Sequence, residues 1–280
     1  MSQTPIGIMQ GRLSPPEDGR FQSFPRNSWR DEIALAREAG LDYMEWIFDD
    51  YGASANPIVT EEGAAELNSL KTRFGIATPA ICVDWLMDFP PIRCTEDERA
   101  ERERMLHELL RHAMEIGASR VVLPFVDASS IRTEDEKATV LDILERALPL
   151  AEGAGVEMHL EADFGPDDFA GFLARIPHAM LKVNYDSGNS SGLGYNASEE
   201  FAAYGNRIGS IHIKDRQRKP GGGVLTKPLG EGDADFEDVF ASIRRINYSG
   251  GLTLQAARGE AGDEVNWVKR QLAFVRRYWT

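Results

Sequence analysis

Short apolar runs alternate with longer amphipathic stretches along the chain, and each pair has the lengths of a strand and a following helix. Eight such units in succession predict parallel strands joined by right-handed crossovers. The pattern favours a (β/α)8 TIM barrel formed by residues 1–280 as one domain, because such barrels need about 250 residues. An open, doubly wound sheet is the structural alternative. In the first half, the predicted strands are residues 5–9, 43–47, 77–83 and 120–125, and the predicted helices are 28–38, 61–74, 96–116 and 134–152.

The second half of the pattern, residues 157–255, contains four more predicted strands in which polar and apolar side chains alternate. Intervening positions such as Met158, Val183 and Ile211 are apolar and should face the helices. The polar set should then face the barrel interior, where burial is costly unless the groups bind one another or a ligand. Strand by strand, the polar positions are Glu157, His159 and Glu161; Lys182, Asn184 and Asp186; Ser210, His212 and Lys214; and Thr253 and Gln255.

One polar residue lies near the carboxyl end of each of these strands: Glu161, Asp186, His212 and Gln255. In a parallel barrel these strand ends meet at one mouth. Carboxylate, imidazole and amide oxygen groups together suit a divalent metal ion such as Mn²⁺, Mg²⁺, Co²⁺ or Zn²⁺. We therefore expect one divalent metal ion, held by these four side chains.

Each predicted ligand also has an explanation that needs no metal. His212 could be a hydrogen-bonded core histidine, and Asp186 could cap a helix or form an Asx-turn. Glu161 could form a buried ion pair with a lysine of the neighbouring strands, and Gln255 could bond a neighbouring group. The joint arrangement on four successive strands favours metal binding over these separate explanations.

Two long segments, residues 10–25 and 84–94, follow the first and third predicted strands at the same end of the barrel. Long ordered loops in compact domains are often functional. We expect Arg12 and Trp85 to contact a substrate, with a solvated or packed loop residue as the alternative. Glu45, near the end of the second strand, is a further candidate substrate contact if it reaches the mouth; it could equally pair with a buried arginine. Further candidates on these loops are Arg20, Gln22, Phe24, Met87 and Phe89.

Basic residues surround a glycine run, residues 221–223, between the seventh and eighth predicted strands. At that end of a barrel, basic side chains and exposed backbone N–H groups can hold a phosphate or a carboxylate. Arg218 and Arg258 are the candidate substrate contacts here, and a flexible loop is the other explanation of the glycines. The remaining basic residues of this region are Arg216, Lys219 and Lys227.

Composition narrows the classes of partner. The formal net charge of −14 argues against a broad grip on nucleic-acid phosphates. The sequence contains no apolar run of about 18 residues and no apolar signal-peptide core, so we expect no membrane span and no export. Cys82 and Cys94 are expected to be unpaired thiols in the cytoplasm. Because no Walker or dinucleotide motif is present, no nucleotide cofactor is expected.

The whole chain resembles the xylose-isomerase-like TIM-barrel superfamily of sugar and sugar-phosphate isomerases and epimerases. The resemblance rests on Glu161, on the DSGN run of residues 186–189, on the HIKD run of residues 212–215, and on PLGEGDADFEDVFASIRRINYSGG at residues 228–251. These motifs are specific for the superfamily and much less specific for the substrate.

The resemblance implies one divalent metal at the ends of strands five to eight, which would chelate the carbonyl and an adjacent hydroxyl of a sugar and stabilise an enediolate. It implies that Glu161 moves the proton. His159, Lys214 or Glu45 is the expected catalytic partner of Glu161. We expect Asn189, the last residue of the DSGN run, to contact the substrate.

Gln255 departs from the family pattern, because many relatives carry glutamate on strand eight. An amide can ligate a metal but adds no charge and cannot act as a base. We predict an isomerase or epimerase of a sugar or sugar phosphate; the alternatives are a dehydratase of a cyclic keto-polyol and a sugar-binding barrel without catalysis. A DNA-repair endonuclease, an activity known on this fold, is disfavoured by the acidic charge and by only five histidines. Residues 274–280 could close the outer ring of helices or form a homo-oligomer interface.

Overall fold

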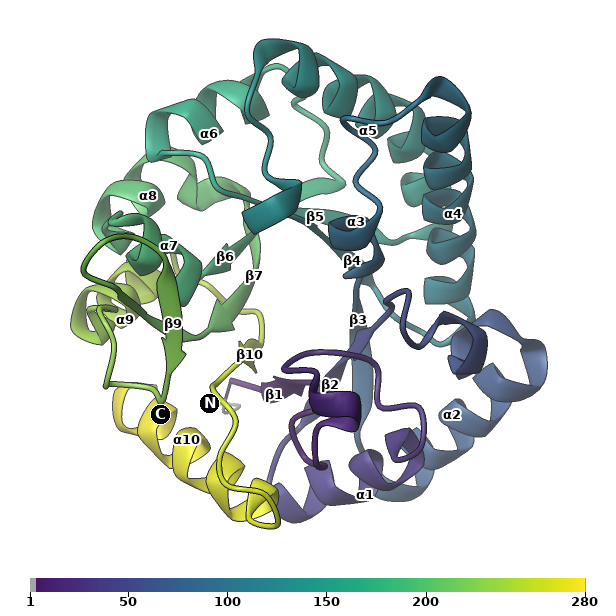
Figure 1. Cartoon of the computed structure of the whole chain (residues 1–280), viewed down its shortest axis with the longest axis vertical. Coiled ribbons are helices and arrows are strands. Elements are labelled where there is room, and N and C mark those ends of the chain that lie inside the picture. Colours follow the sequence, from purple (N-terminus) through teal and green to yellow (C-terminus); the bar gives the residue numbers. More distant parts are fainter. Residues whose placement is uncertain (1–3, 280) are drawn as a thin grey trace.

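The computed structural model describes residues 4–279, and its centre is a closed barrel of eight parallel strands surrounded by helices (Figure 1). Each strand pairs with two neighbours, and β1 pairs with both β2 and β10 to close the ring. This closure confirms the predicted TIM barrel and excludes the open, doubly wound sheet. The barrel strands are β1 (Ile6–Met9), β2 (Tyr43–Ile47), β3 (Ala77–Cys82), β4 (Arg120–Phe125), β5 (Glu157–Ala162), β6 (Leu181–Asp186), β7 (Ile208–Ile213) and β10 (Leu252–Leu254).

The helices of the first half agree with the predicted bounds to within two residues. Thr60, Thr95 and Thr133 start α2, α4 and α5, because each hydroxyl accepts a hydrogen bond from a backbone N–H of the first turn. No helix in the described part of the chain combines the length and apolarity that a membrane crossing requires. The helices are α1 (Trp29–Ala39), α2 (Glu61–Phe74), α3 (Trp85–Asp88), α4 (Glu96–Glu115), α5 (Glu134–Ala154), α6 (Pro166–Ala174), α7 (Ser187–Leu193), α8 (Ala197–Tyr204), α9 (Phe236–Arg245) and α10 (Glu264–Tyr278).

Both faces of the barrel strands are buried. Met158 and Ile211, on the face predicted to pack against helices, have no exposed surface, and burying such a side chain is worth about 1.5–3 kcal/mol. His159 and His212, on the opposite face of the same strands, are also fully buried. The polar faces of the second half are therefore inside the barrel, where each group needs a partner.

The amino-terminal end of the barrel is closed by the ring of Tyr43. Its hydroxyl lies 2.9 Å from Thr253 Oγ1, and its ring passes so close to Gly7 and Gly251 that neither position has room for a Cβ atom. This plug leaves the carboxyl ends of the strands as the open end of the barrel.

Two segments predicted as loops contain regular structure. The glycine run is not a flexible loop: β8 (Asp215–Arg218) and β9 (Val224–Lys227) form an antiparallel hairpin, with residues 221–223 at its turn in left-handed backbone conformations. The hairpin was not predicted because its first strand is polar and the two apolar residues of its second strand are partly or fully exposed, so neither strand has the apolar signal of a core strand. The short helix α3 likewise interrupts the loop after β3.

The carboxyl-terminal aromatic residues close the outer ring of helices. The ring of Tyr278 stacks on Phe240 of α9 with centroids 5.1 Å apart, and Trp279 lies 6.0 Å from the same ring. These contacts confirm the first of the two predicted roles for the segment, whose last residue, Thr280, lies outside the described residues.

Candidate functional site

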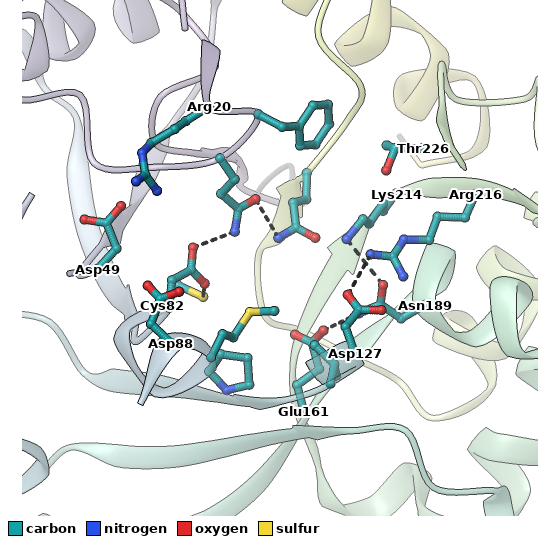
Figure 2. A pocket seen from close by; sticks show the side chains of 17 residues that line it. Arg20, Asp49, Cys82, Asp88, Asp127, Glu161, Asn189, Lys214, Arg216 and Thr226 are labelled. Atoms are coloured by element: carbon teal, nitrogen blue, oxygen red, sulfur yellow. Dashed lines mark hydrogen bonds and ion pairs between the residues drawn. The ribbon is translucent and has the colours of Figure 1, made fainter. Parts of the chain in front are cut away.

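A cavity of about 270 Å³ opens at the carboxyl ends of the barrel strands (Figure 2). Active sites of TIM barrels lie at this end. Its wall joins strand-end residues of β5, β7 and β10 with residues of the segments that follow β1, β2, β3 and β4. The charged and amide side chains of the wall are Arg20, Gln22, Asp49, Asp84, Asp88, Asp127, Glu161, Asn189, Lys214, Arg216 and Gln255.

Three of the four predicted metal ligands converge at the base of this cavity. Glu161, Asp186 and His212 each offer one ligand atom, and these atoms lie within 4.8 Å of one another. His212 Nδ1 lies 3.6 Å from Glu161 Oε2 and 3.8 Å from Asp186 Oδ2. The three side chains are buried, because they come from the adjacent strands β5, β6 and β7 and point into the barrel.

The two carboxylate oxygens of Asp186 have different surroundings. Oδ1 caps α7 by accepting the N–H groups of Gly188 and Asn189, both at 2.8 Å. Oδ2 is buried without a hydrogen-bond partner. The cap that the sequence offered as an alternative to metal binding is thus present, and it leaves one oxygen for a metal.

Gln255 brings a second buried oxygen without a partner to the same cavity. Its amide nitrogen donates to Gln22 Oε1 at 3.2 Å, while its Oε1 has no hydrogen-bond partner. Leaving a buried polar oxygen unpaired costs about 1–3 kcal/mol, and a cation satisfies such an oxygen. Two carboxylates and one imidazole converge here, and the amide oxygen of Gln255 lies on the wall of the same cavity; these donor types suit a divalent metal ion.

Glu45 orients the imidazole of His212. His212 Nε2 lies 2.7 Å from Glu45 Oε1, and both side chains are fully buried. Burial disfavours the charged imidazole, but the Glu45 carboxylate outweighs this effect and raises the pKa of His212 to about 9. A carboxylate behind a ligating histidine is a common feature of metal sites. The structure thus places Glu45 beneath His212. It does not line the cavity wall, so the predicted substrate contact of Glu45 is not observed.

Glu161 is held by two amides. Asn184 Nδ2 donates to Oε2 at 2.7 Å, and Asn189 Nδ2 donates to Oε1. Burial, and secondarily the nearby charge of Asp186, raises the pKa of Glu161 to about 7. A carboxyl group with a pKa near neutrality can both take and return a proton at that pH.

Lys214 lies on the cavity wall beside Asn189. Its Nζ donates to Asn189 Oδ1 at 3.3 Å and lies 3.6 Å from Asp186 Oδ2. The aliphatic stem of Lys214 passes over Gly188, where an added Cβ would lie 2.7 Å from Lys214 Cγ. The glycine of the DSGN run is therefore required for this lysine to reach the cavity.

His159 lies deeper in the barrel than Glu161. It has no exposed surface and does not line the cavity. Its Nδ1 lies 2.7 Å from Ser210 Oγ, which donates to Asn184 Oδ1 at 2.6 Å. Because Asn184 also donates to Glu161, His159 is connected to Glu161 through two side chains and is not in contact with the cavity.

Arg12 and Arg258 hold the β1–α1 segment onto the barrel rather than lining the cavity. Arg12 donates to the carbonyl oxygens of Ala256 at 3.2 Å and Phe21 at 3.0 Å. Arg258 donates to the carbonyl oxygens of Gly11, Ser14 and Phe21. The two arginines thereby position the residues that do line the cavity, among them Gln22.

Trp85 and Arg218 also lie off the cavity wall. The ring of Trp85 packs on Phe89 at 4.9 Å, whereas Met87 and Asp88 of the same segment reach the wall. Arg218 is exposed and pairs with Asp233 at 3.2 Å. Of the six predicted substrate contacts, only Asn189 belongs to the wall.

Sequence reasoning missed four carboxylates of the cavity wall: Asp49, Asp84, Asp88 and Asp127. Three of them follow a barrel strand by one or two residues, since β2 ends at Ile47, β3 at Cys82 and β4 at Phe125. The rule that found the metal ligands, a polar residue at a strand end, would have found these three as well. Arg20 and Gln22, which the sequence offered only as loop candidates, line the cavity.

Comparisons with known proteins agree with this geometry. The family model described as xylose isomerase-like TIM barrel matches residues 33–278. L-ribulose-5-phosphate 3-epimerase UlaE of Salmonella paratyphi C (strain RKS4594) is 24% identical over 285 residues, which cover 97% of this chain and 96% of that protein.

Two solved structures share the fold at low sequence identity. D-allulose 3-epimerase from Methylomonas sp., in complex with D-allulose, has a TM-score of 0.74 and 16% identity, covering 99% of this chain and 98% of that one. The IOLI protein with a bound zinc atom has a TM-score of 0.74 and 18% identity, covering 99% of each chain. Since the family model spans most of the sequence, this chain belongs to the xylose isomerase-like TIM-barrel family.

Proposed function

We propose that this chain is a divalent-metal-dependent isomerase or epimerase of a sugar or sugar derivative. The observation that carries the proposal is the convergence of Glu161, Asp186 and His212 at a cavity whose wall also holds the unpaired amide oxygen of Gln255. The names of the relatives support it, because UlaE and the Methylomonas protein are both sugar 3-epimerases.

The four ligand residues would hold one ion, with Gln255 as the neutral member of the set. When bound, the ion supplies positive charge beside the oxygens of the sugar and lowers the cost of enediolate formation. Asn184 and Asn189 fix the carboxylate of Glu161, so its orientation does not depend on the substrate.

Glu161 is the proposed base, which takes the proton from the carbon next to the sugar carbonyl. Lys214 is the proposed partner, because its ammonium group lies on the cavity wall and can donate to a substrate oxygen or carbon. His159 would act only through Ser210 and Asn184, as a positioning residue for Glu161.

Proton exchange tests the proposal directly. Each of a panel of ketoses and aldoses is incubated in D₂O with protein loaded with Mn²⁺, Mg²⁺, Co²⁺ or Zn²⁺, and loss of the C–H signal is followed by NMR. We expect metal-dependent exchange that falls by about 10²- to 10⁴-fold in Glu161→Gln. Glu199→Gln, an exposed carboxylate on α8, is the matched control and should exchange normally. Absence of exchange across the panel with metal bound would refute the proposal.

Gln255 motivates two further candidates. Because Gln255 cannot act as a base, Glu161 is left as the carboxylate base of the site. Loss of water from a cyclic keto-polyol needs no second carboxylate on strand eight. Appearance of enone absorbance in the ultraviolet would identify such a dehydratase. Tight binding of a sugar without exchange or loss of water would instead identify a sugar-binding barrel without catalysis.

A further inference from the structure

The backbone N–H groups of the turn after β9 are already occupied by a carboxylate of the chain itself. The turn after β9 points the N–H groups of Gly230 and Gly232 at Asp215 Oδ2, at 2.9 and 2.8 Å, and that of Ala234 at Asp215 Oδ1, at 3.1 Å. Asp215 is fully buried. Gly232 lies against this carboxylate with no room for a Cβ atom. An internal carboxylate therefore fills the anion-binding turn that glycines and N–H groups commonly offer to a phosphate.

The arginines expected to hold a phosphate are engaged elsewhere. Arg218 pairs with Asp233, and Arg258 donates to three carbonyl oxygens of the β1–α1 segment. Arg12 donates to the carbonyl oxygens of Phe21 and Ala256 and to Gln22 Oε1. Binding a phosphate ester through Arg12 or Arg258 would require breaking contacts that hold the β1–α1 segment on the barrel.

The cavity wall itself carries more negative than positive groups. Five carboxylates line it, against three cations. Two of the cations already face carboxylates: Arg216 lies 3.3 Å from Asp127, and Lys214 lies 3.6 Å from Asp186. The third, Arg20, stacks on the ring of Tyr51 at 4.4 Å. The wall therefore has no pair of unengaged cations for a phosphate dianion.

Asp49, Asp84 and Asp88, on the segments that follow β2 and β3, disfavour further negative charge nearby. Burial raises the pKa of Asp84 and of Asp88 above the usual range of aspartate, and for Asp88 the nearby Asp50 raises it further. Burial likewise raises the pKa of Asp49, and Asp88 contributes to that shift. A dianion placed beside these groups would add like-charge repulsion. Sugar hydroxyls, in contrast, donate hydrogen bonds that carboxylates accept.

We propose that the cavity binds an uncharged polyhydroxy carbonyl compound, such as a free ketose, and discriminates against its phosphate ester. The inference rests on the proposed function, since it names the substrate class of the same site. The carboxylates of Asp49, Asp84 and Asp88 accept hydrogen bonds from sugar hydroxyls. In the ester, phosphate takes the place of one hydroxyl and moves others away from these carboxylates. Loss of those bonds and like-charge repulsion both weaken the ester.

Binding of matched pairs tests the inference separately from catalysis. Dissociation constants of D-fructose and D-fructose 6-phosphate, and of L-ribulose and L-ribulose 5-phosphate, are measured by calorimetry on metal-loaded protein. Proton exchange is followed on the same samples. We expect at least one free sugar to bind at least about 10-fold more tightly than its ester. An ester that binds as tightly as its free sugar, or no binding by any of the four compounds, overturns the inference.

One variant tests the physical cause. Asp127→Asn removes a negative charge from the wall and releases Arg216, so ester affinity should rise by roughly 5-fold relative to that of the free sugar. Glu199→Gln removes the same charge from an exposed helix position and should leave the ratio unchanged. An unchanged ratio in Asp127→Asn overturns the charge explanation. Preference for the free sugar without proton exchange would support the inference and refute the proposed enzymatic function. Faster proton exchange of an ester than of its free sugar would support the proposed enzymatic function and overturn the inference.

Discussion

The two sides of the barrel mouth are built differently. On the ligand side, the ends of β5, β6, β7 and β10 hold the candidate metal ligands on strands whose backbones are fixed by hydrogen-bonded ladders. On the loop side, the segments after β1 to β4 supply the additional carboxylates of the wall. Sites built on strands hold their geometry more closely than sites built on loops. The ligand side is therefore suited to holding a metal and moving a proton, and the loop side to selecting the substrate.

Gln22 is the side chain that connects the two sides. Its Nε2 donates to Asp84 Oδ2 on the loop side at 2.7 Å, and its Oε1 accepts from Gln255 on the ligand side at 3.2 Å. Arg12 donates to the same Oε1 at 2.7 Å. A substitution at Gln255 should therefore affect both sides, whereas substitutions deeper in the barrel should affect the ligand side alone.

The largest effect that separates the two sides is expected for Glu45→Gln. Glu45 holds His212 with its Nδ1 toward the other ligands, and its negative charge strengthens the imidazole as a donor. Replacement by an amide of the same size should weaken metal binding by about 10- to 100-fold. Competition with a fluorescent chelator measures this affinity.

Glu157→Gln is the matched control for that substitution. Glu157, at the start of β5, lies 2.9 Å from His159 Nε2 and is partly exposed, so it forms a glutamate–histidine pair away from the candidate ligands. Its substitution should leave metal affinity within about 2-fold. Equal losses in the two variants would contradict a specific role for Glu45 and indicate a general disturbance of the barrel interior.

A smaller effect, with opposite consequences on the two sides, is expected for Gln255→Glu. The added negative charge should tighten metal binding by about 10-fold, because ligand charge is a main determinant of affinity at such sites. The substitution also removes the amide that donates to Gln22 Oε1 and places a carboxylate against that oxygen. The β1–α1 segment should then be cleaved faster by a protease, without loss of the barrel's circular dichroism. Tighter metal binding with unchanged proteolysis would show that Gln22 does not couple the two sides.

The ligand side could be predicted from sequence, whereas on the loop side only the carboxylates just beyond β2, β3 and β4 obey the same strand-end rule. Strand alternation places every second side chain inside the barrel, so Glu161, Asp186 and His212 follow from the pattern alone. In an irregular segment no such period exists, and the pattern could not tell that Arg12 faces backbone carbonyls while Gln22, ten residues later, faces the cavity. Gln255 was found because it follows a strand directly.

Tertiary contacts also determine the roles of single residues, and the local sequence pattern does not predict these contacts. Glu45 shares the period that points into the barrel, but its depth relative to the mouth depends on the register of β2 against β1. Arg218 ends the polar strand β8 of the hairpin, and its partner Asp233 lies beyond that hairpin. Register and hairpin pairing are set by packing of the whole barrel, so local patterns do not determine them.

The smallest effect on the site itself concerns the support behind the ligand side. Glu200 of α8 is buried, accepts from Ser190 Oγ of α7 and accepts from the hydroxyl of Tyr204 at 2.7 Å. Burial raises its pKa from 4.5 to about 7. Its folded-state pKa is thus above its unfolded value, so its contribution to stability is fully present below pH 4.5 and is lost as the pH rises through 7. Above pH 7 the buried charge is a cost in the folded state.

Glu200→Gln removes that cost while an amide can still bond both hydroxyls. The variant should gain stability over the natural protein as the pH rises from about 5 to 7, by up to about 3 kcal/mol at neutral pH. Urea unfolding at pH 5 and pH 7.5 measures the difference, with Glu199→Gln as the exposed control. Proton exchange should persist, because the strands and not this acid fix the ligand side. A variant that is destabilised at pH 7.5 would instead show that the ionised carboxylate of Glu200 stabilises α7, and with it the cap that Asp186 provides.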